Sequence, residues 1–99
     1  MIRGTTPTHI FKVPIDLTEA AEVYITYKQD GEIKVEKNIG DMTITEEDIT
    51  VKLTQTETLA FSTIGEVEIQ CRARFPDGSA PASRIKKIPV CKILKEGVI

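Results

Sequence analysis

Hydrophobic and polar residues alternate without a break over residues 66–75 of the chain. A period of two places every second side chain on the same face of a β-strand. The apolar face of this strand carries Val67, Ile69, Cys71, Ala73 and Phe75. The turn sequence Pro76-Asp77-Gly78 and a second apolar-rich run come next, so the pattern predicts a half-buried antiparallel hairpin.

Shorter runs of β-type sequence predict the remaining strands. They are expected at residues 8–13, 23–28, 33–37, 42–45, 49–54 and 84–93. Pro7 and Pro14 flank the first of these runs and Pro89 interrupts the last, which favours edge positions because proline cannot donate to a sheet. The turn Gln29-Asp30-Gly31 is of the Asp-Gly type that favours a tight hairpin.

Two short segments have helical character. Residues 16–22 predict one helical turn with Asp16 as its cap. Thr54 and Glu57 have the spacing of a capping box, which predicts a second short turn. With about seven antiparallel strands and one or two helical turns, residues 1–99 are expected to form a single all-β domain, an immunoglobulin-like β-sandwich.

Composition excludes several partners. The net charge of -2 and the pI near 5.4 give no overall attraction to nucleic acid or to an anionic membrane. No apolar run reaches the roughly 20 residues that a membrane span needs, and the first residues lack the apolar stretch of a signal peptide. We therefore expect synthesis in a cytoplasm and no membrane or nucleic-acid partner.

The two cysteines are expected to stay reduced. With residues 76–83 as the hairpin loop, Cys71 faces about Ile88, and Cys91 lies ~10 Å further along the strand. That separation exceeds the Cα distance of about 7 Å that a disulfide tolerates. The sequence therefore predicts two free, partly buried thiols.

Catalytic and metal-binding motifs are not apparent. His9 is the single histidine, and no nucleophile or orienting carboxylate accompanies it in a recognisable motif. The acidic run Glu46-Glu47-Asp48 lacks the ligand spacing and the glycine of a calcium loop, so a solvated turn is the simpler interpretation. We expect no enzymatic activity, no cofactor and no metal.

One surface is a candidate for protein docking. Arg72 and Arg74 occupy the polar face of the long strand, and Arg84 and Lys86 are expected nearby across the hairpin. Tyr24 points away from the apolar face of its strand and is a candidate for the same surface, since tyrosine is favoured at interfaces. The alternative interpretation is an ordinary solvated sheet face.

Several stretches together resemble a known group of proteins. They are residues 2–7, 23–31, 53–59 and 66–70, followed by Pro76-Asp77-Gly78 and Ser83. Their order resembles small prophage-encoded tail-region proteins of Gram-positive bacteria, and is similar in layout to the N-terminal domain of the phage baseplate upper protein. The resemblance spans about residues 2–94. The coiled-coil linker and the receptor-binding-protein dock of the longer baseplate proteins are missing from this chain.

The resemblance implies a non-enzymatic structural or assembly module of a phage tail or baseplate. Its partners would be other tail or baseplate proteins or further copies of itself, and its location would be the virion. The alternative is a β-sandwich module that binds glycans or cell wall, although few aromatic residues are free to form a stacking platform.

Overall fold

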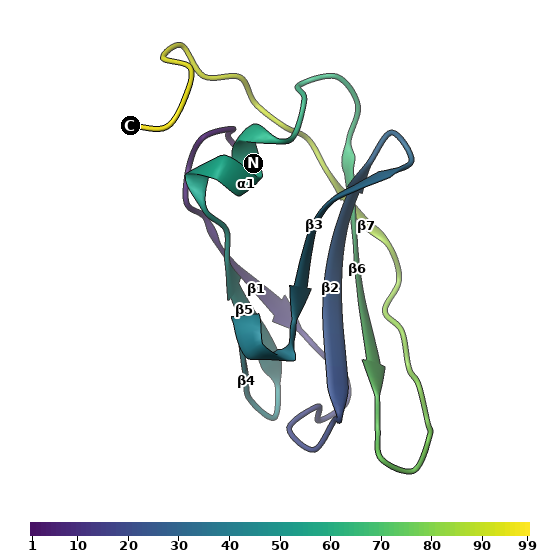
Figure 1. The fold of residues 1–99 in the computed structure, drawn as a ribbon. Helices are drawn as coiled ribbons and strands as arrows, with labels where there is room; N and C mark the ends of the chain where they lie inside the picture. Colours follow the sequence, from purple (N-terminus) through teal and green to yellow (C-terminus); the bar gives the residue numbers. More distant parts are fainter.

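The alternating segments form the two longest strands of the computed structural model, which describes residues 1–99 (Figure 1). They are β2 (Glu22–Gln29) and β6 (Val67–Arg74), and they pair antiparallel along most of their length. β3 (Glu32–Asn38) flanks β2, and β7 (Lys86–Ile88) flanks β6. The resulting four-stranded sheet has the order β3-β2-β6-β7.

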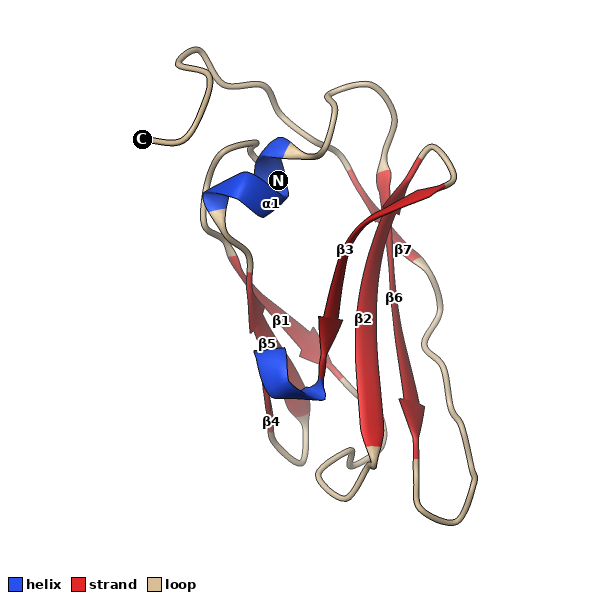
Figure 2. Ribbon diagram, in the orientation of Figure 1, coloured by secondary structure: helices blue, strands red, loops and turns tan.

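A second, three-stranded sheet faces the first one (Figure 2). Its order is β1 (Thr8–Lys12), β5 (Asp48–Lys52) and β4 (Met42–Ile44), and all its pairings are antiparallel. The short helix α1 (Gln55–Leu59) lies at one end, near the N-terminus, and the 3-10 turn η1 (Ile39–Asp41) links β3 to β4. The expected all-β sandwich with one or two helical turns is confirmed.

The strand order identifies which strand of an immunoglobulin sandwich this chain lacks. Such sandwiches have one sheet in the order A-B-E-D and an opposing sheet built from strands C, F and G, to which C′ can be added. Here β1, β5 and β4 correspond to B, E and D, while β3, β2, β6 and β7 correspond to C′, C, F and G. No strand occupies the position of A beside β1.

The core lies between the sheets and consists of the residues that the alternation assigns to the inner face. Fourteen buried hydrophobic residues form one cluster. Those from the two long strands are Val23, Ile25, Tyr27, Val67, Ile69 and Ala73. Each of these side chains is at most 6% exposed, so the predicted inner faces of both strands are confirmed.

Local signals in the sequence explain the ends of the elements. Asp30 and Gly31 both have positive φ values, 52° and 76°, as a tight two-residue hairpin requires. Thr54 accepts a hydrogen bond from the Glu57 amide, and the Glu57 carboxylate accepts one from the Thr54 amide, so the capping box is confirmed. β1 and β7 lie at sheet edges, as their flanking prolines predict.

Three local expectations were wrong. Residues 16–22 form no helix, because the Asp16 carboxylate accepts hydrogen bonds from the Thr18 amide and hydroxyl and holds a turn instead. Gln29 belongs to β2 rather than to the turn, and its side chain is buried. The final edge strand is short, since β7 spans only residues 86–88.

The hairpin register also differs from the expected one. Cys71 lies opposite Ser83, whose amide donates to the Cys71 carbonyl, and not opposite Ile88. Both cysteines are free, as expected. Cys71 is half-buried, but Cys91 is exposed, which corrects the expectation that both thiols are partly buried.

Candidate functional site

Tyr24, Arg72 and Arg74 come together on the outer face of the four-stranded sheet. Tyr24 is the register partner of Arg72, and Glu22 is the partner of Arg74. All three predicted residues are exposed, and Tyr24 retains 38% of its surface. Together with Glu22, Thr26 and Glu36 they surround a shallow hollow of about 340 Å³. We call these six residues the outer-face patch.

Charges of both signs meet in this patch. Nε of Arg74 lies 3.7 Å from Oε2 of Glu22, and the Thr26 hydroxyl donates to Oε2 of Glu36 at 3.2 Å. Arg72 has no carboxylate within ion-pair distance. Exposed pairs of this kind contribute little to stability, so the charged groups remain available to a partner.

Arg84 and Lys86 lie elsewhere. Lys86 pairs with Ile69 of β6, and paired residues point to the same side of a sheet, so Lys86 is on the side of the core. Both residues line a groove between the two sheets, away from the outer-face patch. The five residues predicted as one docking surface therefore fall on two surfaces that β6 separates.

The groove opens along the side of the sandwich where strand A is missing. It has a volume of about 540 Å³ and is lined by 17 residues, of which ten are hydrophobic. Its floor includes Ile25, Ile69 and Ala73 of the long strands, and one wall is formed by residues 10–15. The other wall is formed by residues 81–84 and by Lys86. We call this feature the inter-sheet groove.

Sequence reasoning missed the contribution of β1 to this groove. Ile10 is 61% exposed although it lies in a strand between the half-buried residues His9 and Phe11. An isoleucine on the polar face of an edge strand was the available signal. It could not be recognised without knowing that strand A is absent.

His9 joins the two sheets through a hydrogen bond to Tyr27. Its Nδ1 shares a hydrogen bond of 2.7 Å with the Tyr27 hydroxyl, which is buried on β2. Burial and the positive charges of the N-terminus and Lys86 lower the pKa of His9. Burial, helped by the negative charge of Glu57, raises the pKa of Tyr27. The pair is thus held neutral and bridges the layers.

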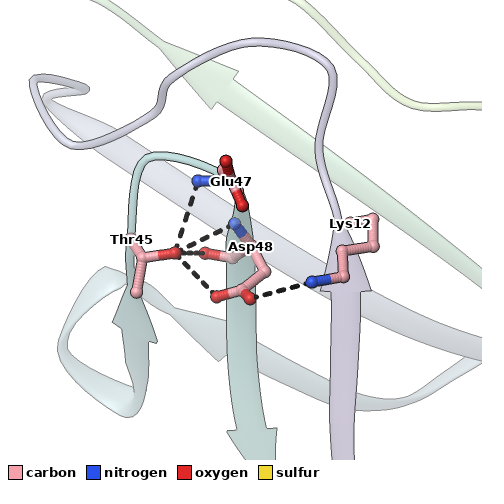
Figure 3. Close-up of polar contacts among 4 residues, drawn as sticks. All are labelled: Lys12, Thr45, Glu47 and Asp48. Atoms are coloured by element: carbon pink, nitrogen blue, oxygen red, sulfur yellow. Dashed lines mark hydrogen bonds and ion pairs between the residues drawn. The ribbon is translucent and has the colours of Figure 1, made fainter.

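The acidic turn is organised by its own side chains, as Figure 3 shows. The Thr45 hydroxyl donates to Oδ1 of Asp48 at 2.7 Å and accepts from the Glu47 and Asp48 amides. Nζ of Lys12 lies 3.3 Å from Oδ2 of Asp48. The hydrogen bond from Thr45, followed by that from Lys12, lowers the pKa of Asp48. No three His, Cys, Asp or Glu side chains gather as a metal site would need.

Comparison of the chain with protein-family models, with curated proteins and with solved structures finds no match. Neither helix has the length and apolar character needed to cross a membrane.

Proposed function

We propose that this chain is a non-enzymatic docking module of a phage tail or baseplate, which binds another tail protein or further copies of itself. The observation that carries the docking role is the outer-face patch, where Tyr24, Arg72 and Arg74 stand exposed side by side on a rigid two-strand platform. The phage assignment rests on the sequence resemblance, above all on residues 23–31 and 66–70.

The patch has the chemistry of a protein interface. Tyrosine and arginine are enriched in interfaces because they combine apolar area with hydrogen-bonding groups. Arg72 has no ion-pair partner within the chain, so it can pair with a carboxylate of a partner without first breaking a contact. β2 and β6 are held by a continuous ladder and a buried inner face, so docking needs no rearrangement of the backbone.

The test is charge reversal on the patch. The double variant Arg72→Glu/Arg74→Glu is compared with Lys52→Glu/Lys92→Glu, which changes the net charge equally at exposed positions outside the patch. Binding to the purified tail proteins encoded by neighbouring genes is measured by surface plasmon resonance. We expect the patch variant to lose at least tenfold in affinity and the control to stay within threefold. Equal affinities in both variants would contradict the proposal.

Self-association is tested by the solution mass from light scattering. A defined trimer or hexamer that the patch variant breaks would make the partner a second copy. A monomer that binds a tail protein would make the module an adaptor between different proteins.

The alternative, a glycan- or cell-wall-binding module, is favoured by one feature of the same patch. Tyr24 lies in a hollow with Thr26, Glu36 and Arg72, which pairs an aromatic face with polar groups. A glycan array with the parent chain and Tyr24→Ala separates the two functions. Glycan binding that disappears in Tyr24→Ala supports the alternative, and an array without hits removes it.

A further inference from the structure

The inter-sheet groove has an unpaired backbone edge along one of its walls. The Leu53 amide donates to the Pro7 carbonyl, the Val13 amide donates to the Glu47 carbonyl, and His9 and Phe11 face β5 residues between them. Bonded residues alternate in an antiparallel ladder, so the odd-numbered residues of β1 bond to β5. The backbone groups of Thr8, Ile10 and Lys12 therefore point to the open edge, where β1 has no neighbouring strand.

The groove beside this edge is apolar at its floor and basic at its rim. Ile25 and Ile69 lie at its floor, and Ile10 and Ile15 leave 61% and 44% of their surfaces exposed beside it. Lys12, Arg84 and Lys86 line it, and no Asp or Glu does. Arg84 and Lys86 have no ion-pair partner, and Lys12 holds Asp48 only through an exposed contact.

We infer that the inter-sheet groove is a second binding site, which accepts an extended segment of a partner protein as the missing strand A. The segment pairs its backbone with Thr8, Ile10 and Lys12 of β1. Every second side chain of the segment is apolar and enters the groove, because side chains alternate along a strand. Carboxylates of the segment meet Arg84, Lys86 and Lys12, so the partner segment is acidic.

Pro14 limits the length of the segment at one end. It follows Lys12 in the series of even-numbered residues that face the open edge, and it lacks the amide that a ladder needs. A segment of about six residues would cover β1 up to this proline at the usual rise per residue. The same proline limits uncontrolled strand addition along this edge.

The inference deepens the proposed docking function by naming the chemistry of a partner, but it uses a different surface. It is tested by panning a display library of random twelve-residue peptides on the purified chain. We expect enriched peptides with alternating apolar residues and at least two carboxylates. No enrichment, or enrichment of basic or non-alternating peptides, would overturn the inference.

Two variants locate the binding of an enriched peptide, measured by fluorescence anisotropy. Ile10→Pro removes an amide at the open edge that makes no bond to β5, and Ile10→Thr keeps that amide as the matched control. We expect Ile10→Pro to lower the affinity at least tenfold and Ile10→Thr to change it less than threefold. Equal binding by the two variants would show that the peptide does not use the β1 edge.

If Ile10→Pro does not fold, the charge-reversal variant Arg84→Glu/Lys86→Glu tests the inference independently. Both side chains are exposed, so their replacement should leave the fold intact. We expect this variant to weaken acidic peptides at least tenfold, and unchanged binding would overturn the inference. The patch variant Arg72→Glu/Arg74→Glu is expected to bind the peptide with the affinity of the parent chain. The proposal for the groove and the proposal for the outer-face patch can therefore be refuted separately. A dimer that Ile10→Pro dissociates would assign the groove to a second copy instead.

Discussion

Gln29 is a buried polar residue on which the entry to β6 depends. Its side chain is 1% exposed, its Nε2 donates to the Ser62 carbonyl at 2.9 Å, and its Oε1 accepts from the Ser62 amide at 2.8 Å. The same Nε2 lies 3.3 Å from the carbonyl of Gly65, two residues before β6 begins. One amide therefore fixes the loop of residues 62–65 to the end of β2.

The substitution Gln29→Ala removes both hydrogen bonds to Ser62 and leaves a small void. Two bonds at about 1 kcal/mol each, with the cost of unpaired groups and lost packing, give an expected destabilisation of about 2–4 kcal/mol. Urea unfolding at neutral pH, followed by circular dichroism, measures it from the shift in midpoint at constant slope.

The matched control is Gln70→Ala, in the same sheet. The Gln70 amide donates a single exposed hydrogen bond of 3.0 Å to the Ser83 carbonyl, and its loss should cost about 0.5 kcal/mol. A loss below about 1 kcal/mol for Gln29→Ala, or equal losses in the two variants, would refute the reasoning that Gln29 holds the loop.

Three further predictions concern single contacts. The pKa of His9 is lowered in the fold, so the unfolded chain binds more protons and the free energy of unfolding should fall as the pH drops through about 6.5. Thermal unfolding at pH 7.5 and 5.5 measures this change, and the difference between the two pH values should be smaller in His9→Gln. Cys91 is exposed, whereas burial raises the pKa of Cys71, so iodoacetamide at pH 8 should modify Cys91 at least tenfold faster than Cys71. Equal modification rates of the two cysteines, measured by mass spectrometry, would contradict the burial of Cys71. Arg3 donates to the carbonyls of Leu59, at the end of α1, and of Phe61, so Arg3→Leu should lower the free energy of unfolding in urea by about 1–3 kcal/mol. Glu96→Gln removes only the exposed ion pair of Arg3 and should cost less than about 0.5 kcal/mol.

The elements that the sequence predicted correctly are those governed by short-range rules. In β2 and β6 successive side chains point alternately to the core and to solvent, so the order of apolar and polar residues predicts which side chains are buried. The cap of α1 depends on two side chains, Thr54 and Glu57, that lie three residues apart. Such signals require no knowledge of the rest of the fold.

The position of Arg84 and Lys86 was not predictable in this way, because it depends on the length of a turn. The Gly78 amide donates to the Phe75 carbonyl, and the Phe75 amide donates to the Ser79 carbonyl, so the hairpin closes sooner than expected. Lys86 therefore pairs with Ile69 rather than with Ala73, about 13 Å further from the hairpin tip. The four basic residues expected on one docking surface are therefore divided between the outer-face patch and the inter-sheet groove.

The open edge of β1 follows from where the first residues of the chain are held. Ile2 pairs with Cys91 beyond the end of β7, and Arg3 bonds to the carbonyls of Leu59 and Phe61. Residues 1–3 are thus committed to the four-stranded sheet and cannot also cover β1.

This arrangement is difficult to explain as a feature of stability alone. An unpaired strand edge beside an apolar groove is a liability for association, which sandwiches usually avoid by covering the edge. Here Pro14 limits the length of the edge but does not close it, and the rim retains two cations, Arg84 and Lys86, without ion-pair partners. An open edge that is limited in length and lies beside basic side chains can select between extended segments of different charge and length, whereas a covered edge would bind no segment. The groove therefore has the properties of a selective binding site, and its occupant should be found among acidic extended segments of the proteins that assemble with this chain.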